Sequence, residues 1–164
     1  MIEKNFIGHT LSAKGERVTR GSNPVTSEVL PGDFINATDE EITDTVSKSA
    51  LAFETYRTKT GREKAKFLRA IAEEIENLGE VLIERCCAES GLPLLRVKGE
   101  CGRTTSQLRM FADLIEEGSW VEAVIENGDS KRSPIPKPDL RRMLVPLGPV
   151  AVFAASNFPL AFST

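Results

Sequence analysis

The apolar run at residues 150–154 constrains the fold more than any other stretch of the chain. It is rich in β-branched and aromatic side chains and follows a Gly-Pro pair, a pattern typical of a strand buried on both faces of a parallel sheet. Ser156 or Asn157 can cap a helix, and Pro159 suits a first helical turn, where its missing N–H has no partner to lose. The sequence therefore predicts a strand, a tight turn and a helix start, the junction at which ligands bind in open α/β sheets.

Upstream, three stretches carry apolar residues at spacings of three and four, which predicts amphipathic helices. Capping boxes begin the first helix at Thr38 and the second at Thr60, and Pro93 begins the third. We expect Gly79 to interrupt the second helix, because glycine in a helix interior costs about 1 kcal/mol relative to alanine. Gly91 is its predicted C-terminal stop. The three stripes suit packing on one another and packing on a sheet, and the pattern leaves both open.

Strand signals flank these helices. Residues 4–18 contain apolar and glycine positions that predict a short hairpin. Residues 120–125 and 140–147 are β-prone and straddle a loop at 127–139, in which three alternating prolines enforce extended backbone. The sequence contains no internal repeat.

Composition excludes several classes of protein. The 164 residues are 40% hydrophobic, enough for one domain with a core. The 24 acidic and 21 basic residues are mixed along the chain and give a net charge of −3, which argues against a nucleic-acid or anionic-membrane partner. The N-terminus lacks the pattern of a secretory signal and no apolar run is long enough to span a membrane, so we expect a cytoplasmic protein.

The cysteines do not predict a disulfide or a metal site. Cys86, Cys87 and Cys101 are odd in number and two are adjacent, which favours reduced, structural thiols on helices. A zinc site would need further cysteine or histidine at ligand spacing, and the only histidine, His9, lies far away in the sequence. We therefore expect no metal.

The segment at 152–163, Val-Phe-Ala-Ala-Ser-Asn-Phe-Pro-Leu-Ala-Phe-Ser, resembles the Asn-Phe-Pro-Leu segment of the aldehyde dehydrogenase superfamily. Its alanine-serine version is similar to the branch that acts on α-ketoglutaric semialdehyde (2,5-dioxovalerate) and on fatty aldehydes. Residues 87–93 and 102–109 support the resemblance, which implies that the chain is the N-terminal portion of such an enzyme. The turn at 23–28 is similar to the family's Asn-Pro-x-Thr-Gly-Glu turn, with Ser27 in place of the glycine.

The resemblance implies an α/β fold with three main helices, the first strand of a Rossmann-like parallel sheet, and strands of an oligomerisation arm. Residues 1–119 would form the N-terminal hairpin and the helical part of the dinucleotide-binding domain. Residues 120–147 would form the arm strands with the proline-rich loop, and residues 148–164 the truncated first strand, turn and helix of the Rossmann-like core. The expected partners are a small-molecule aldehyde and further copies of the chain in a homo-oligomer.

The resemblance also implies a reaction: NAD(P)-dependent oxidation of an aldehyde to its carboxylic acid through a thiohemiacetal, in a full-length parent. The implied cofactor is NAD or NADP. The sequence does not distinguish the two, because the residues that contact the 2′ position of the ribose come after the next strand. The family's nucleophilic cysteine and general-base glutamate are not in this sequence, so we expect the chain alone to be inactive and to aggregate, to associate, or to be part of a longer chain. A non-catalytic helical interaction module and an acyl-CoA-forming relative stay open as alternatives.

Five residues of the final segment are candidate site residues. Asn157 maps onto the family's oxyanion-hole asparagine, since an amide beside a helix N-terminus can stabilise developing negative charge; helix capping alone is the alternative. The resemblance places Ala154, Ala155 and Ser156 against the ribose and nicotinamide side of the dinucleotide, and strand–helix packing is their alternative role. Phe158 would line the aldehyde tunnel, or else belong to the core.

Arg103 is the candidate for substrate recognition. By resemblance it lies on the helix that flanks the tunnel mouth, and its guanidinium matches the distal carboxylate of a short oxo-acid aldehyde in a bidentate fork. The alternatives are a solvated side chain or an intrahelical pair with Glu100 or Glu89. Lys98, Glu100 and the charged residues between 62 and 76 are otherwise expected on solvated helix faces.

Overall fold

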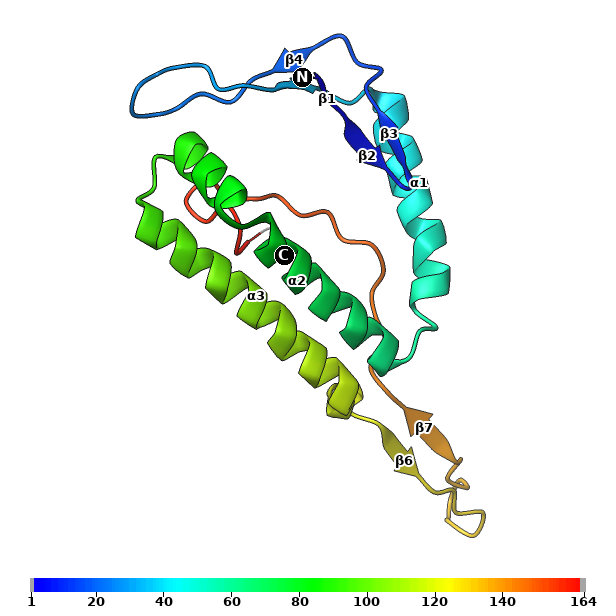
Figure 1. Cartoon of the computed structure of the whole chain (residues 1–164). Coiled ribbons are helices and arrows are strands. Elements are labelled where there is room, and N and C mark those ends of the chain that lie inside the picture. Colours follow the sequence, from blue (N-terminus) through cyan, green and yellow to red (C-terminus); the bar gives the residue numbers. More distant parts are fainter. Residues whose placement is uncertain (1, 163–164) are drawn as a thin grey trace.

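A computed structural model describes residues 2–162 and places three long helices between short strands (Figure 1). The helices are α1 (Asp39–Tyr56), α2 (Gly61–Ser90) and α3 (Leu94–Glu117), followed by a 3₁₀ turn, η1 (Ser119–Val121). The strands are β1 (Ile2–Glu3), β2 (Asn5–Ile7), β3 (Thr10–Ser12), β4 (Val18–Thr19), β5 (Asp33–Ile35), β6 (Val124–Glu126) and β7 (Leu140–Arg142). No helix among the described residues is both long and apolar enough to cross a bilayer.

The helix boundaries follow the predicted caps. Thr38 and Thr60 each accept a hydrogen bond from the N3 backbone amide, and the N3 glutamate reaches back, so both capping boxes are confirmed. Gly91 ends α2 in the left-handed conformation, as predicted. The interruption at Gly79 is also confirmed: its φ of 55° and ψ of −134° are non-helical, and α2 breaks there (Figure 1).

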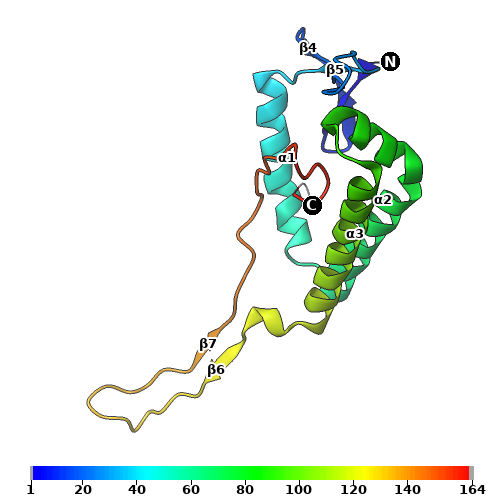
Figure 2. The same ribbon diagram turned by 90° about the vertical axis from the view of Figure 1, so that its left-hand side faces the viewer.

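Helices α2 and α3 form an antiparallel pair and hold most of the core (Figure 2). Their contact is lined by small side chains, which let the two backbones approach. The fully buried members are Ala65, Ala72, Val97 and Ala112. Ion pairs close the edges: Arg69 Nη2 lies 2.6 Å from Asp113 Oδ1, and Arg109 binds Glu76. Of the two arrangements that the sequence left open, α2 and α3 therefore adopt packing on one another.

Helix α1 stands apart from this pair over most of its length and packs on the N-terminal hairpin instead (Figure 1). Glu41 makes the connection, because its carboxylate accepts hydrogen bonds from the Ser12 hydroxyl and, at 3.2 Å, from the Lys14 amide. The apolar stripe of α1 is uncovered: Ile42 is 53% exposed and Val46 is 63% exposed.

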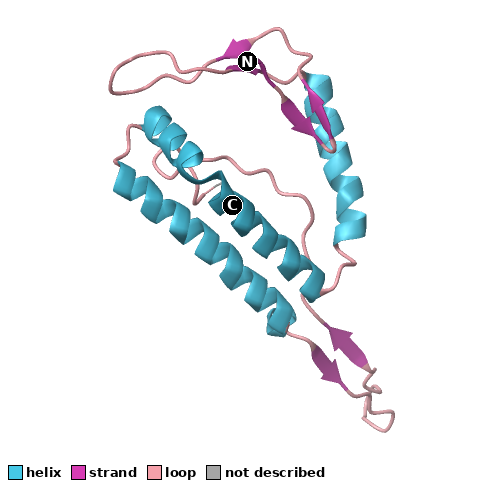
Figure 3. Ribbon diagram, in the orientation of Figure 1, coloured by secondary structure: helices cyan, strands magenta, loops and turns pink. Residues whose placement is uncertain are grey.

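The strands form three small sheets, shown in magenta in Figure 3. Strands β2 and β3 make the predicted N-terminal hairpin. Strand β5 lies between β1, its parallel neighbour for two residues, and the antiparallel β4. Strands β6 and β7 pair antiparallel and project away from the helices (Figure 2). The β-prone segment at 120–125 is strand only from Val124, because η1 occupies its first part.

The predicted first strand of a Rossmann-like sheet is wrong for this structure. Residues 151–154 form no strand, and Val152 and Phe153 are 63% and 93% exposed rather than buried. Residues 156–162 form turns rather than the start of a helix. A strand is held by hydrogen bonds to its neighbours, and no strand within residues 2–162 lies beside this run. The local sequence signal is therefore not sufficient to form the element.

Candidate functional site

The segment that carries Asn157 is held against helix α3 by a buried carboxylate. Glu100 Oε1 accepts hydrogen bonds from the backbone amides of Leu160 at 2.9 Å and Ala161 at 3.0 Å. A turn precedes these residues, closed by a hydrogen bond of 3.2 Å from the Phe158 amide to the Ala155 carbonyl. Asn157 thus lies on a turn, and the chain is attached to α3 three residues further on, at Leu160.

Two arginines of α3 contact the same segment. The Arg96 guanidinium lies 4.4 Å from the centre of the Phe158 ring, and the Arg103 guanidinium lies 5.9 Å from it. Both distances fall within the range of cation–π attraction. Phe158 also stacks on Phe162, with ring centres 4.6 Å apart. Phe158 is therefore half-buried between two cations and a second ring, rather than in the core.

Asn157 itself is exposed. Its backbone carbonyl accepts a hydrogen bond from Arg96 Nη2 at 3.5 Å. Among the hydrogen bonds of residues 2–162, none involves its side-chain amide, so that amide is available to a ligand. It caps no helix, because none begins there, and the expected support from a helix dipole is absent from the described turn.

The small residues before Asn157 lie at the surface. Ala154 and Ser156 are exposed and Ala155 is half-buried. Their predicted alternative role, packing between a strand and a helix, does not occur in this structure, since neither element forms. Short side chains at the surface leave the backbone open to close approach by a flat ligand.

Arg103 is exposed on α3, on the side that faces Phe158. The predicted intrahelical pair with Glu100 or Glu89 is not formed. Glu89 pairs with Arg85 instead, at 2.7 Å from Nε, and the carboxylate of Glu100 lies 4.0 Å from Arg96 Nη2. Within the described part of the chain, the Arg103 guanidinium is engaged by no carboxylate and stays free to meet one from a ligand.

Glu100 and Arg96 are the residues that the sequence reasoning missed. Glu100 was expected on a solvated face, and this is wrong: only 2% of the residue is exposed. A signal was present in the spacing, because Glu100 lies three residues after Val97 and four before Thr104, both buried on the same face of α3. An acidic residue inside an apolar stripe indicates a specific partner, although not which one.

Two of the three cysteines lie in surroundings that disfavour the thiolate form. Cys86, Cys87 and Cys101 are free thiols on helices, as expected. Burial raises the pKa of the Cys86 thiol and that of Cys101 above the ordinary value. Both side chains are therefore protonated at neutral pH, whereas a reactive cysteine is a thiolate. No group of three potential metal ligands lies together among residues 2–162.

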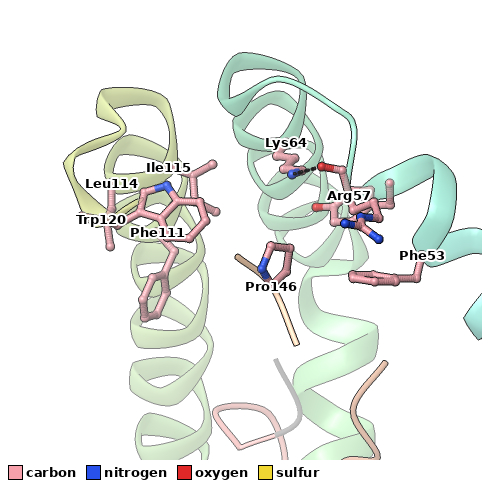
Figure 4. Close-up of a pocket in the computed structure, with 9 residues that line it drawn as sticks. Phe53, Arg57, Lys64, Phe111, Leu114, Ile115, Trp120 and Pro146 are labelled. Carbon is pink, nitrogen blue, oxygen red and sulfur yellow. Dashed lines mark hydrogen bonds between the residues drawn. The ribbon is translucent and has the colours of Figure 1, made fainter. Parts of the chain in front are cut away.

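An apolar pocket of about 330 Å³ lies elsewhere, where α1, α2 and α3 come together near their ends (Figure 4). Figure 4 shows Phe53 and Arg57 on one side, Phe111 and Trp120 on the other, and Pro146 between them. The remaining lining residues are Tyr56, Lys64, Leu114 and Ile115. None of the sequence-predicted site residues lines this pocket.

Comparisons with known proteins agree with the resemblance. The profile of the aldehyde dehydrogenase family matches residues 11–164. An α-ketoglutaric semialdehyde dehydrogenase of Acinetobacter baylyi is 47% identical over 131 residues, which are 80% of this chain and 25% of that enzyme. α-Ketoglutaric semialdehyde dehydrogenase 2 of Azospirillum brasilense is 53% identical over 112 residues, 68% of this chain and 21% of that enzyme. The chain thus spans about a quarter of the length of these curated relatives.

A solved structure shares the fold. The 3,6-anhydro-L-galactose dehydrogenase in complex with NADP superimposes with a TM-score of 0.81 at 21% identity, over 99% of this chain and 32% of the other. At this identity the likeness concerns the arrangement of helices and hairpins alone. Together with the match over residues 11–164, it leads to one conclusion. The chain belongs to the aldehyde dehydrogenase family.

Proposed function

We propose that the chain is the N-terminal portion of an NAD(P)-dependent dehydrogenase that oxidises α-ketoglutaric semialdehyde, or a related oxo-acid aldehyde, to its carboxylic acid. The observation that carries this proposal is the identity of 47% and 53% to two α-ketoglutaric semialdehyde dehydrogenases. The free, exposed amide of Asn157 on a turn fixed to α3 supports it. Within this portion we assign residues 1–119 and 148–164 to the dinucleotide-binding domain and residues 120–147 to an oligomerisation arm.

The role proposed for Asn157 is electrostatic. When a thiolate from the rest of the enzyme adds to the aldehyde carbon, a C–S bond forms and the carbonyl electron pair moves to oxygen. An amide N–H aimed at that oxygen stabilises the charge as it develops, so it lowers the barrier rather than tightening ground-state binding. The bound nicotinamide would accept the hydride from that carbon. Ala154, Ala155 and Ser156 fit its dinucleotide, because they present short side chains and accessible backbone at the surface.

Arg103 is proposed to select the substrate. Its guanidinium is free of carboxylate partners in the described chain and lies on the same side of α3 as Phe158. A substrate with a distal carboxylate would give Arg103 the bidentate partner that its own helix does not supply. Phe158 would then form part of the wall along which the aldehyde passes.

The test of Asn157 uses the complete enzyme that contains this chain. We expect Asn157→Ala to lower kcat for α-ketoglutaric semialdehyde by about 10²- to 10³-fold, because one oxyanion donor is lost. The dinucleotide dissociation constant and the unfolding midpoint should stay at the parent values, since no residue in the described part of the chain binds the Asn157 side chain. A variant with the parent kcat would reject the catalytic role. The 164-residue chain by itself should show no turnover with aldehyde and either cofactor, and turnover would contradict the proposal.

The test of Arg103 separates substrate recognition from chemistry. We expect Arg103→Ala to raise KM for α-ketoglutaric semialdehyde by at least about tenfold, the worth of one hydrogen bond to a charged group. KM for an uncharged aldehyde of similar length should not change. Arg109→Ala is the matched control, because Arg109 lies on the same helix and pairs with Glu76. An unchanged KM for the carboxylated substrate would eliminate this role.

A further inference from the structure

Glu100 places a carboxylate where a helix of this kind would ordinarily have an apolar side chain. Its side chain is 1% exposed, and one of its oxygens binds two consecutive backbone amides 60 and 61 residues further along the chain. A carboxylate oxygen is a stronger acceptor for backbone N–H groups than a neutral oxygen. These hydrogen bonds join the Asn157 segment to the N-terminal half of α3.

Burial of the Glu100 carboxylate costs free energy of hydration. This cost indicates that Glu100 has a role other than stabilising the fold. A buried charge loses its hydration and is compensated only if it is well paired. Glu100 Oε2 has no hydrogen-bond partner among the described atoms, and Arg96 Nη2 lies 4.0 Å away from it. A leucine at this position would fill the space without that penalty, but it could not hold the two amides.

The contacts fall in a short stretch around Asn157. Arg96 reaches the Asn157 carbonyl and covers the Phe158 ring, and Glu100 holds the amides three and four residues after Asn157. Both side chains come from one face of α3, one helical turn apart. The segment is therefore held on both sides of Phe158 by a single rigid element.

We propose that Glu100 is a positioning residue, which fixes the turn that carries Asn157 so that the Asn157 amide meets the reacting oxygen. The inference rests on the oxyanion role proposed for Asn157. Loss of the Glu100 carboxylate frees the amides of Leu160 and Ala161 and lets the turn leave α3. A displacement of about 1 Å at a catalytic group lowers the rate by about 100-fold, although the group itself is intact.

The experiment uses the complete enzyme with Glu100→Leu and Glu100→Gln. We expect Glu100→Leu to lower kcat by about 10- to 100-fold. Glu100→Gln should lose less, because its amide oxygen still accepts hydrogen bonds and its shape is the same. Glu116→Gln, an exposed and paired glutamate on the same helix, should keep the parent kcat. Should Glu100→Leu fail to fold, the loss in Glu100→Gln decides the matter.

A double variant distinguishes positioning from a general loss of structure. If Glu100 acts through Asn157, Asn157→Ala with Glu100→Leu has the same kcat as Asn157→Ala alone, because the group to be positioned is already gone. Amide hydrogen exchange at Leu160 and Ala161 should be faster in Glu100→Leu and partly restored in Glu100→Gln. Losses of kcat that multiply in the double variant would overturn the inference.

The outcomes also separate this inference from the proposed function. Parent kcat in both Glu100 variants, together with a large loss in Asn157→Ala, would overturn the positioning role and leave the oxyanion role standing. Parent kcat in Asn157→Ala would overturn the oxyanion role, and the positioning role with it. Unchanged exchange at Leu160 and Ala161 would show that the carboxylate does not hold the turn.

Discussion

At the scale of single residues, the turn at 23–28 holds Ser27 in a backbone conformation that residues with a side chain do not favour. Ser27 has a φ of 63°, in the left-handed region, where a Cβ atom crowds the following carbonyl. The turn is otherwise well bonded: the Ser27 amide donates to the Asn23 carbonyl at 2.7 Å, and the Asn23 amide donates to the Glu28 carbonyl at 2.8 Å. These bonds hold Ser27 in a left-handed geometry that glycine would adopt without strain.

Ser27→Gly should therefore stabilise the chain. Relief of the left-handed conformation is worth about 1 kcal/mol, less the entropy that glycine gains in the unfolded state. We expect a higher midpoint of urea unfolding with an unchanged slope. Ser22→Gly is the control, because Ser22 lies in extended backbone bridged to Val29 and should lose stability. A midpoint equal to that of the parent, or lower, would show that Ser27 carries no strain.

Asn157 and Glu100 show how much of the candidate site the sequence predicts at the scale of single residues. Asn157 is predicted as a site residue because its neighbours form a motif, and motifs are local in the chain. The burial of Glu100 could be suspected from its spacing, but its partners, Leu160 and Ala161, lie 60 residues away. Which amides a buried carboxylate binds is a property of the folded chain, and helix periodicity does not contain it.

At the scale of elements, the break in α2 comes from one backbone conformation. Gly79 has φ 55° and ψ −134°, a combination that residues with a side chain rarely adopt, although a Cβ atom there would meet no other atom within 4 Å. Gly99, inside α3, also has open space around it, and its backbone is helical. Both glycines have room for a Cβ atom, and they differ in backbone geometry.

Alanine should have opposite effects at these two positions. Gly79→Ala should lower the free energy of unfolding by about 1–3 kcal/mol, because alanine is strained in that conformation. Gly99→Ala should raise it by up to about 1 kcal/mol, because alanine favours the helix. Urea unfolding followed by circular dichroism measures both. Stabilisation by Gly79→Ala would mean that α2 straightens without loss.

The α2–α3 pair should also respond to acid through Glu76. Arg109 binds this carboxylate with both terminal nitrogens, at 2.6 and 2.7 Å, and lowers its pKa from 4.5 to about 2. A carboxylate with a depressed pKa stabilises the fold above its unfolded pKa, and this contribution is lost as pH falls towards the folded pKa. The expected window is therefore from pH 4.5 down to about 2.

Arg109→Met tests this window. Stability at neutral pH should fall relative to the parent, and the difference between the two proteins should shrink as pH drops from 4.5 towards 2, because the parent loses the pair there. Thermal unfolding across this pH range is the measurement. Lys66→Met removes an exposed cation of α2 and should give a difference that does not depend on pH in this way. A constant difference for Arg109→Met would contradict the linkage.

Helices and strands differ in how far the sequence predicts them, and the reason is where their hydrogen bonds go. The three helices satisfy their own backbone, so Thr38, Thr60 and Gly91 mark their ends reliably. A strand needs a neighbour. Residues 150–154 have the composition of a buried strand, yet they are irregular and exposed where no adjacent strand is present in the described chain.

At the scale of the whole molecule, apolar surface is left uncovered. The stripe of α1 is exposed, and so is the segment from 143 to 153, where Leu147 is 99% exposed. The pocket of Figure 4 lies between them. Large continuous apolar surfaces on a folded chain mark places where another surface packs. In the proposed enzyme, the remainder of the chain and further copies would cover them.

The 164-residue chain alone should therefore self-associate as its concentration rises. Light scattering after size-exclusion chromatography should show this, together with binding of a dye that reports apolar surface. We expect Leu147→Ser with Phe153→Ser to reduce the association without changing the unfolding midpoint, because both side chains are almost fully exposed. Val25→Ser removes an exposed apolar residue outside this surface and should have little effect. A parent chain that stays monomeric as its concentration rises would contradict the predicted self-association.

The projecting hairpin of β6 and β7 joins only three residue pairs, and β7 is exposed along its whole length. A two-stranded ribbon of this kind is marginal in water by itself. If its free edge is where copies of the proposed enzyme meet, then docking and ordering of the ribbon are one event, governed by mass action. Dilution would then disorder the ribbon while the α2–α3 pair stayed intact. The fraction of chains with an ordered ribbon would therefore depend on the protein concentration.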